Sequence, residues 1–119
     1  MKISKLTNCP DWLREADTEN ADIMIIDGKV HWNSGTWHSG TWKNGYWYNG
    51  TWKDGTWNSG IWCNGTWYDG NWYNGTWISG NWEAGTWHHG IWKTGNWKGG
   101  KWVKGIWRCG LPTSLLLTL

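Results

Sequence analysis

The 119-residue sequence contains no phenylalanine, and leucine, isoleucine and valine are sparse. This composition excludes an ordinary globular core built from aliphatic and phenylalanine side chains. The three cysteines, Cys9, Cys63 and Cys109, are odd in number and have neither paired nor metal-type spacing. Their arrangement argues against a disulfide framework and favours a reducing compartment.

Long apolar runs are also missing. No stretch approaches the roughly 20 residues that cross a membrane, and Met1 to Ser4 lead into no apolar segment typical of a signal peptide. We therefore expect a cytoplasmic or virion-associated protein with no membrane partner. Charge is nearly balanced, with 11 basic and 9 acidic residues, but residues 1–30 are acidic and residues 91–110 are basic. A solvated end is the favoured interpretation of this asymmetry over a nucleic-acid contact.

Tryptophan fills the place of the missing apolar residues. Of the 17 tryptophans, sixteen recur every five residues, and we expect them to form the structural core. These residues are Trp32, Trp37, Trp42, Trp47, Trp52, Trp57, Trp62, Trp67, Trp72, Trp77, Trp82, Trp87, Trp92, Trp97, Trp102 and Trp107.

Residues 31–110 form sixteen consecutive units of the form X-Trp-X-X-Gly, with no insertion. A period of five fits neither an α-helix nor a flat strand, and a glycine in every unit would cost a helix about 1 kcal/mol per site. Asn, Asp or Ser before glycine, as in Asn44-Gly45 and Asp54-Gly55, favours a bend. The pattern predicts one all-β solenoid in which stacked coils share a core.

Phased from glycine, each unit has glycine, then often threonine or asparagine, then tryptophan and two variable residues. Residues 31–110 therefore resemble pentapeptide-repeat proteins, whose units have a small residue, Asp or Asn, Leu or Phe, and two variable residues. The resemblance implies a right-handed quadrilateral β-helix with four pentapeptides per coil, four coils and a Trp-filled core. Glycine would replace the inward small residue and tryptophan the inward large one, which roughly conserves core volume.

The number of faces per coil stays open at this point. Four units per coil would stack Ser39 on Ser59, whereas three would stack Thr36 on Thr51. We expect four faces from the resemblance and keep a triangular coil as the alternative. Buried indole N–H groups need acceptors, and we expect carbonyls at the corners, because each orphan would cost about 1 to 3 kcal/mol.

The ends do not repeat. Residues 1–30 are expected to form an N-terminal cap, with a short helix after Pro10, a strand over residues 23–26 and a tight turn at Asp27-Gly28. Residues 111–119 are expected to be a C-terminal cap or a dimerisation tail. Because pentapeptide-repeat proteins commonly dimerise through C-terminal segments, the resemblance implies a homodimer through Leu111 to Leu119.

No spacing of histidines, cysteines or carboxylates is typical of a catalytic or metal site. We expect no enzyme, no catalytic residue, no metal and no cofactor. The family members that imitate DNA need a strongly acidic surface, and these repeats lack one. Long runs of Gly-Thr-Trp units also resemble uncharacterised proteins from phage genomes.

The expected function is a structural or protein-interaction solenoid with an unknown protein partner, and a phage structural or accessory role leads. The alternative is a carbohydrate- or nucleic-acid-binding module that uses surface tyrosines or the basic last coil, with nucleic acid the less favoured partner. The candidate interaction residues are Tyr46, Tyr48, Tyr68, Tyr73, Lys93, Lys98, Lys101, Lys104 and Arg108.

Overall fold

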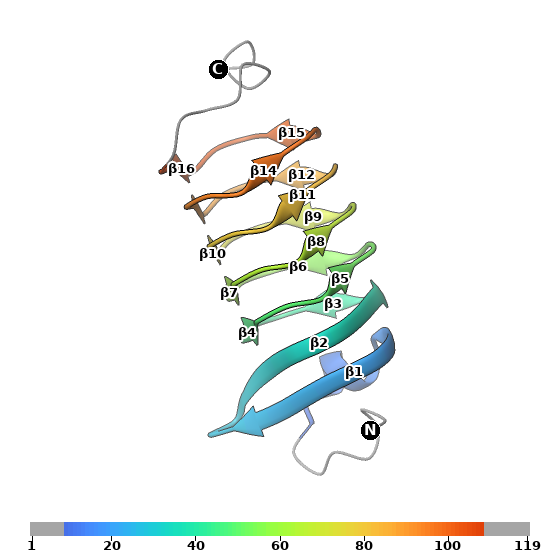
Figure 1. The fold of residues 1–119 in the computed structure, drawn as a ribbon. Helices are drawn as coiled ribbons and strands as arrows, with labels where there is room; N and C mark the ends of the chain where they lie inside the picture. The colour runs from blue at the N-terminus through green and yellow to red at the C-terminus, as the bar shows by residue number, and fades with distance from the viewer. Residues whose placement is uncertain (1–8, 109–119) are drawn as a thin grey trace.

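The computed structural model describes residues 9–108, which form an all-β solenoid of parallel strands behind a short helix and a hairpin (Figure 1). Parallel ladders join residues fifteen positions apart, so that Trp32 pairs with Trp47 and Trp47 with Trp62. Each coil therefore contains three pentapeptides. Sixteen repeats at three per coil make about five coils.

The elements follow the repeat closely. Helix α1 spans Asp11–Arg14, strand β1 spans Asp17–Ile26, and strand β2 spans Lys29–Ser39 and runs through the first two repeats. Each later repeat contributes one two-residue strand. These are β3 (Thr41–Trp42), β4 (Tyr46–Trp47), β5 (Thr51–Trp52), β6 (Thr56–Trp57), β7 (Ile61–Trp62), β8 (Thr66–Trp67), β9 (Asn71–Trp72), β10 (Thr76–Trp77), β11 (Asn81–Trp82), β12 (Thr86–Trp87), β13 (Ile91–Trp92), β14 (Asn96–Trp97), β15 (Lys101–Trp102) and β16 (Ile106–Trp107).

The solenoid and its tryptophan core confirm the predicted fold class, but the coil is triangular and the expected four faces are wrong. Thr36 stacks on Thr51, as the three-faced alternative required. The size of the indole explains the difference. Within the first coil Trp37 meets Trp32 at 5.9 Å and Trp42 at 5.8 Å, and Trp32 meets Trp42 at 6.4 Å, all edge to face. Three indoles in mutual contact already fill the cross-section, so a fourth face has no interior to cover.

The tryptophans form three stacked columns along the solenoid. Trp47 lies 4.6 Å from Trp32 and 4.8 Å from Trp62, with ring planes within 7° of parallel. All repeat tryptophans from Trp32 to Trp102 are buried, and Trp107 in the last strand is partly buried. Stacked aromatic pairs contribute about 0.5 to 1.5 kcal/mol each beyond the burial of their area. The columns therefore stabilise the fold where an aliphatic core is missing.

The expected bonds from indole N–H groups to corner carbonyls are mostly absent among the described residues. Trp52 Nε1 donates to the backbone carbonyl of Asp69 at 3.1 Å. Twelve other buried indole nitrogens find no hydrogen-bond acceptor among residues 9–108, at a cost of about 1 to 3 kcal/mol each, which stacking and burial of the rings must offset. They belong to Trp32, Trp37, Trp42, Trp47, Trp57, Trp62, Trp67, Trp72, Trp77, Trp82, Trp87 and Trp92.

The corner glycines are required by the backbone. Gly65 has φ +124°, and a Cβ there would overlap the carbonyl oxygen of Gly50 in the previous coil. Glycine is thus fixed by its positive φ and by close backbone stacking, and not chiefly by the bulk of a neighbouring tryptophan. The preceding side chain holds the corner amide, since Gly70 N–H donates to Asp69 Oδ1 at 2.8 Å. The predicted role of Asn and Asp in the bend is confirmed.

The N-terminal helix and hairpin cover the first coil. Trp12 in α1 packs edge to face against Trp42 at 5.2 Å, and Leu13 is buried. Strand β1 pairs antiparallel with β2 and places Ile23 opposite Trp32. Apolar side chains of the cap therefore cover the N-terminal end of the tryptophan core. The predicted C-terminal segment, residues 111–119, lies outside the described residues.

Candidate interaction face

Three flat faces run along the solenoid, and one of them, the apolar face, differs from the other two. Its strands are the first part of β2 and then β4, β7, β10, β13 and β16. Side chains alternate between interior and solvent along a strand, so the residues on either side of each tryptophan point outward. Those before tryptophan on this face are His31, Tyr46, Ile61, Thr76, Ile91 and Ile106, and those after it are Asn33, Tyr48, Cys63, Ile78, Lys93 and Arg108.

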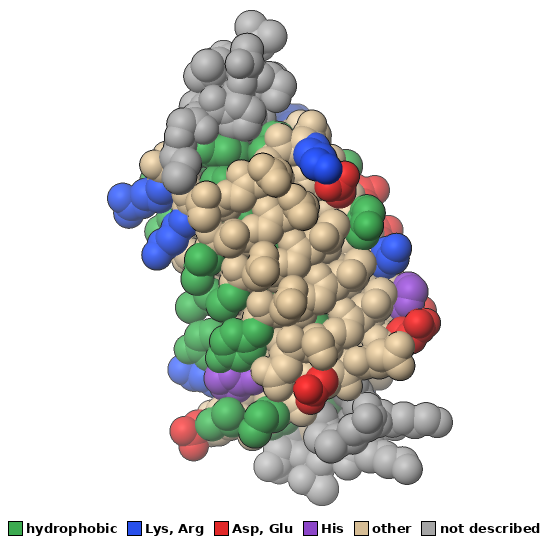
Figure 2. All heavy atoms as spheres, viewed as in Figure 1, with side chains coloured by type: hydrophobic (Ala, Val, Ile, Leu, Met, Phe, Trp, Pro, Cys, Tyr) green, Lys and Arg blue, Asp and Glu red, His purple; other side chains and the backbone are tan. Residues whose placement is uncertain are grey.

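The first of these two columns carries no charge along the whole solenoid. Strand β1 extends it by one row, because Met24 pairs with His31 and is 54% exposed. At the other end Ile106 is 51% exposed. In Figure 2 the hydrophobic side chains gather along the edge of the molecule where β4, β7 and β10 lie in Figure 1. A mainly apolar stripe of this kind, with His31 and Thr76 as its polar members, is typical of an interaction surface.

The second and third faces are polar. Before tryptophan the second face, on the later part of β2 and on β5, β8, β11 and β14, presents Thr36, Thr51, Thr66, Asn81 and Asn96. The third face, on β3, β6, β9, β12 and β15, presents Thr41, Thr56, Asn71, Thr86 and Lys101. On the second face, side chains of neighbouring coils hydrogen-bond to each other, since Asn96 Nδ2 donates to Asn81 Oδ1 at 2.9 Å. Among the described residues, large hydrophobic side chains before tryptophan therefore occur on the apolar face alone, whereas the positions after tryptophan also expose Tyr68 on the second face and Tyr73 and Val103 on the third.

The tyrosines named from the sequence do not form one platform. Tyr46 and Tyr48 lie on the apolar face, Tyr68 on the second and Tyr73 on the third. On the apolar face the ring of His31 stacks on Tyr46 at 4.8 Å, and its Nδ1 hydrogen-bonds with the Tyr48 hydroxyl at 2.9 Å.

Side chains of neighbouring coils also contact the rings of Tyr68 and Tyr73. Tyr73 stacks on His88 at 4.4 Å, and Lys53 Nζ lies 4.5 Å from the centre of the Tyr68 ring. A sugar needs an open aromatic ring face on which to lie. Each of the four rings therefore has a neighbouring side chain against it, and the four rings do not share one open surface.

The basic residues surround the C-terminal end and do not form a stripe along one face. Lys98 on the second face pairs with Glu83 at 3.5 Å. Nucleic-acid binding by a rigid protein needs several cations that follow one phosphate backbone. The five cations named from the sequence, all exposed, are Lys93 and Arg108 on the apolar face, Lys98 on the second face, and Lys101 and Lys104 in the third-face repeat.

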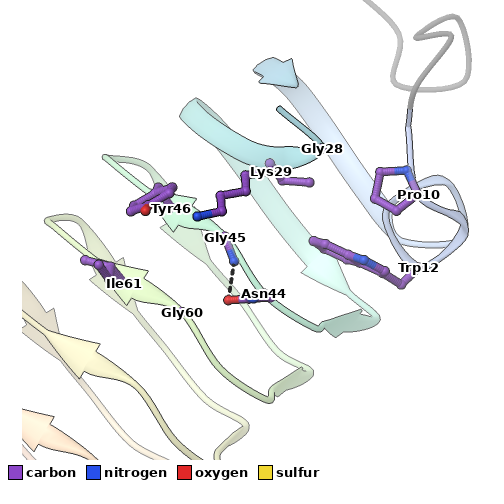
Figure 3. A pocket seen from close by; sticks show the side chains of 10 residues that line it. Pro10, Trp12, Gly28, Lys29, Asn44, Gly45, Tyr46, Gly60 and Ile61 are labelled. Atoms are coloured by element: carbon purple, nitrogen blue, oxygen red, sulfur yellow. Dashed lines mark hydrogen bonds between the residues drawn. The ribbon is translucent and has the colours of Figure 1, made fainter. Parts of the chain in front are cut away.

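A small cavity of about 190 Å³ opens between the N-terminal cap and the first coils (Figure 3). Trp12 and Tyr46 form two of its walls, and Lys29 is the one charged side chain among its described lining residues. Asn44 Oδ1 beside it already accepts the Gly45 N–H at 2.8 Å. The described lining contains no carboxylate or imidazole for acid–base chemistry.

The two described cysteines are not activated. Burial raises the pKa of the Cys63 thiol on the apolar face, and burial also raises the pKa of Cys9 against the opposing effect of Arg14. Both thiols are therefore poor nucleophiles at neutral pH. Among residues 9–108 no three histidine, cysteine or carboxylate side chains gather as metal ligands would. The same part of the chain has no helix that is long and apolar enough to span a membrane.

Four of the residues named from the sequence, Tyr46, Tyr48, Lys93 and Arg108, lie on the apolar face, but its isoleucines were not among the candidates. Ile61, Ile78, Ile91 and Ile106 are scattered when the sequence is examined with a period of five, and they align only when every third repeat is compared. The signal that could have identified them in the sequence is their alignment at intervals of fifteen residues. Comparisons with known proteins add no assignment: no protein-family model matches the chain, and neither the curated proteins nor the solved structures give a match.

Proposed function

We propose that this protein is a non-enzymatic structural or protein-interaction solenoid that binds a partner on its apolar face. The uncharged column from Met24 to Ile106 carries the proposal. Its side chains stand on a hydrogen-bonded ladder, where Ile61 N–H donates to the Gly45 carbonyl at 2.9 Å and Ile91 N–H to that of Gly75 at 2.9 Å. A surface held this way is preorganised, so binding loses little conformational entropy.

The energetics favour an apolar contact. Ile61, Ile78 and Ile91 are partly exposed on the apolar face, and burial of apolar surface contributes about 25 cal/mol per Å². A few central apolar side chains usually supply most of the affinity of an interface. The middle of this face, around Ile61 and Ile78, is therefore where we expect a partner to bind most tightly.

A carbohydrate- or nucleic-acid-binding module is the second candidate function, and the geometry supports it less. The tyrosines are divided among three faces, and each ring has a neighbouring side chain against it. The cations encircle one end, and Glu83 pairs with Lys98 there. A glycan array and a salt-dependent gel shift would test the two ligands directly.

The protein-interaction proposal is tested with a pair of matched variants. Ile61→Glu places a charge in the middle of the apolar face, and Thr66→Glu places the same charge on the neighbouring strand position of the second face. Tagged proteins are used to recover partners from their native source, with quantification by mass spectrometry and melting temperature as a folding control. We expect specific partners to be lost from Ile61→Glu and kept by Thr66→Glu. Equal recovery by both variants would contradict use of this face.

A phage structural or accessory role is the biological setting that we favour for this solenoid. It is supported by the resemblance of its Gly-Thr-Trp runs to phage-encoded proteins. Genes for capsid or tail proteins beside the coding gene, and the protein itself in purified particles, are the expected observations. Absence from particles that contain the neighbouring gene products would contradict a virion location.

A further inference from the structure

We infer that the partner on the apolar face is a second copy of this chain, packed face to face with the two solenoid axes antiparallel. The inference rests on the proposed use of the apolar face for binding and adds the identity and orientation of the partner. Two properties of the face lead to it, namely the symmetry of its apolar rows and the opposite charges at its two ends.

The face has seven rows, beginning at Met24 in β1 and ending at Ile106 in β16. Its middle row consists of Ile61 and Cys63. A two-fold axis that lies in the interface across this row, perpendicular to the solenoid, superimposes the whole stripe on a second copy. Ile61 and Cys63 then meet their own equivalents, and Met24 meets Ile106 of the second copy. A two-fold contact needs such a self-complementary patch.

Charge fixes the orientation. Asp22 is exposed at the β1 end of the face, next to the row of Met24, whereas Arg108 is exposed beside Ile106 at the other end. An antiparallel pair brings Arg108 of each copy to Asp22 of the other. A parallel pair would bring Lys93 and Arg108 of both copies together and leave four cations at one end. Opposite charges at matching positions favour the antiparallel arrangement.

The size of the face predicts how strong the contact is. Seven rows about 4.8 Å apart extend over roughly 30 Å, and two side-chain columns make a strip roughly 10 Å wide. Two such strips bury on the order of 600 Å² in total, less than the roughly 1,200 Å² of stable complexes. The dimer is therefore weak and forms with increasing protein concentration.

Sedimentation velocity over a range of concentrations tests the dimer with the full chain. We expect a monomer–dimer equilibrium for the wild type and for Thr66→Glu, and dimerisation about tenfold weaker for Ile61→Glu. Arg108→Asp should weaken the dimer in the same assay. The double variant Asp22→Arg, Arg108→Asp should restore it, because the two charges are exchanged. Failure of the double variant to recover would overturn the antiparallel orientation.

Cross-linking tests the position of the two-fold axis. In a Cys109→Ser background, a short bis-maleimide should join two chains through Cys63 at mildly alkaline pH. The matched control replaces Cys63 with serine and Thr66 with cysteine, which moves the thiol to the second face. Covalent dimer from the Cys63 protein alone supports the inference. Equal yields from both proteins would overturn it.

The remaining outcomes separate this inference from the other predictions. A wild type that stays monomeric, while Ile61→Glu still loses partners from its native source, would leave the proposed function standing and overturn self-association. A dimer that survives Ile61→Glu but disappears when the chain ends at Gly110 would assign the contact to the predicted tail, Leu111 to Leu119, and not to the apolar face.

Discussion

The apolar face and the second face are built on the same scaffold but present different surfaces. Both have a tryptophan in each strand, a glycine at each corner and a ladder at intervals of fifteen residues. At the position before tryptophan, the apolar face carries tyrosine and three isoleucines, whereas the second face carries threonine and asparagine. The comparison indicates that the interior determines the fold and is the same on every face, whereas the outward positions are free to vary and determine binding.

The largest effect should come from the shared core. Trp62→Ala on the apolar face and Trp67→Ala on the second face each remove one ring from a stacked column, with neighbours at 4.7 to 4.8 Å. We expect each to lower the free energy of unfolding by about 3 to 5 kcal/mol, measured by denaturant titration. The wild-type emission should be blue-shifted and poorly quenched by iodide. A large difference between the two variants would show that the faces are not equivalent inside.

The corner glycines should rank next. Gly65→Ala and Gly70→Ala follow the apolar and second faces, and each forces a side chain into positive φ and onto a backbone carbonyl. We expect both to lose about 2 to 4 kcal/mol. Gly99→Ala is the matched control, because its φ is not positive and its Cβ would lie 3.2 Å from the Glu83 carbonyl oxygen. That contact is tight, but it is less severe than the overlaps with backbone carbonyl oxygens at Gly65 and Gly70. If all three melted alike, backbone conformation would not be the reason for glycine.

Removal of the side chains that hold the corners should lower stability less, and by the same amount on the two faces. Asn49 Oδ1 accepts the Gly50 N–H at 2.9 Å after the apolar face, and Asp69 Oδ1 accepts the Gly70 N–H at 2.8 Å after the second face. Asn49→Ala and Asp69→Ala should each cost about 1 kcal/mol of unfolding free energy. Substitution to serine, which other corners carry, should recover part of it. Unchanged melting temperatures would contradict this role for the two side chains.

Substitutions of outward isoleucines should have the smallest effect on stability but should show the difference in surface hydrophobicity between the two faces most clearly. Ile78→Ser and Ile91→Ser remove partly exposed apolar groups from the apolar face. We expect the unfolding free energy to change by less than about 0.5 kcal/mol, while binding of a hydrophobic fluorescent dye falls. Thr66→Ser on the second face is the control and should leave dye binding unchanged. Dye binding that persists in the isoleucine variants would locate the exposed apolar surface elsewhere.

The interior was predictable from the sequence because its period is unbroken. Trp and Gly in each unit predicted inward rings, corner bends and stacked coils, and Pro10 and Asp27-Gly28 predicted the helix and hairpin of the cap. The number of faces was not predictable from a period of five, because it depends on how many indoles fill one layer. Trp32, Trp37 and Trp42 determine that number by their mutual contacts at 5.8 to 6.4 Å.

The candidate site was only partly predictable. Tyr46 and Tyr48 were predicted to be interaction residues because they are aromatic residues at variable positions. Tyr68 and Tyr73 were predicted on the same ground, but they lie on other faces. Residue type alone cannot tell which of three faces an outward side chain occupies. Once the coil length is known, Ile61 and Ile91 align with Tyr46 and reveal the stripe.

The triangular coil also constrains how such a molecule can change in length during evolution. The repeat has five residues, but the smallest insertion or deletion that preserves every face has fifteen. Loss of a single pentapeptide would leave each remaining unit able to fold, since all units have the same interior. It would nevertheless turn every downstream side chain onto the neighbouring face and divide the apolar stripe in two. Many insertions and deletions of pentapeptides would therefore preserve the fold, but only those that add or remove whole coils would preserve the binding surface.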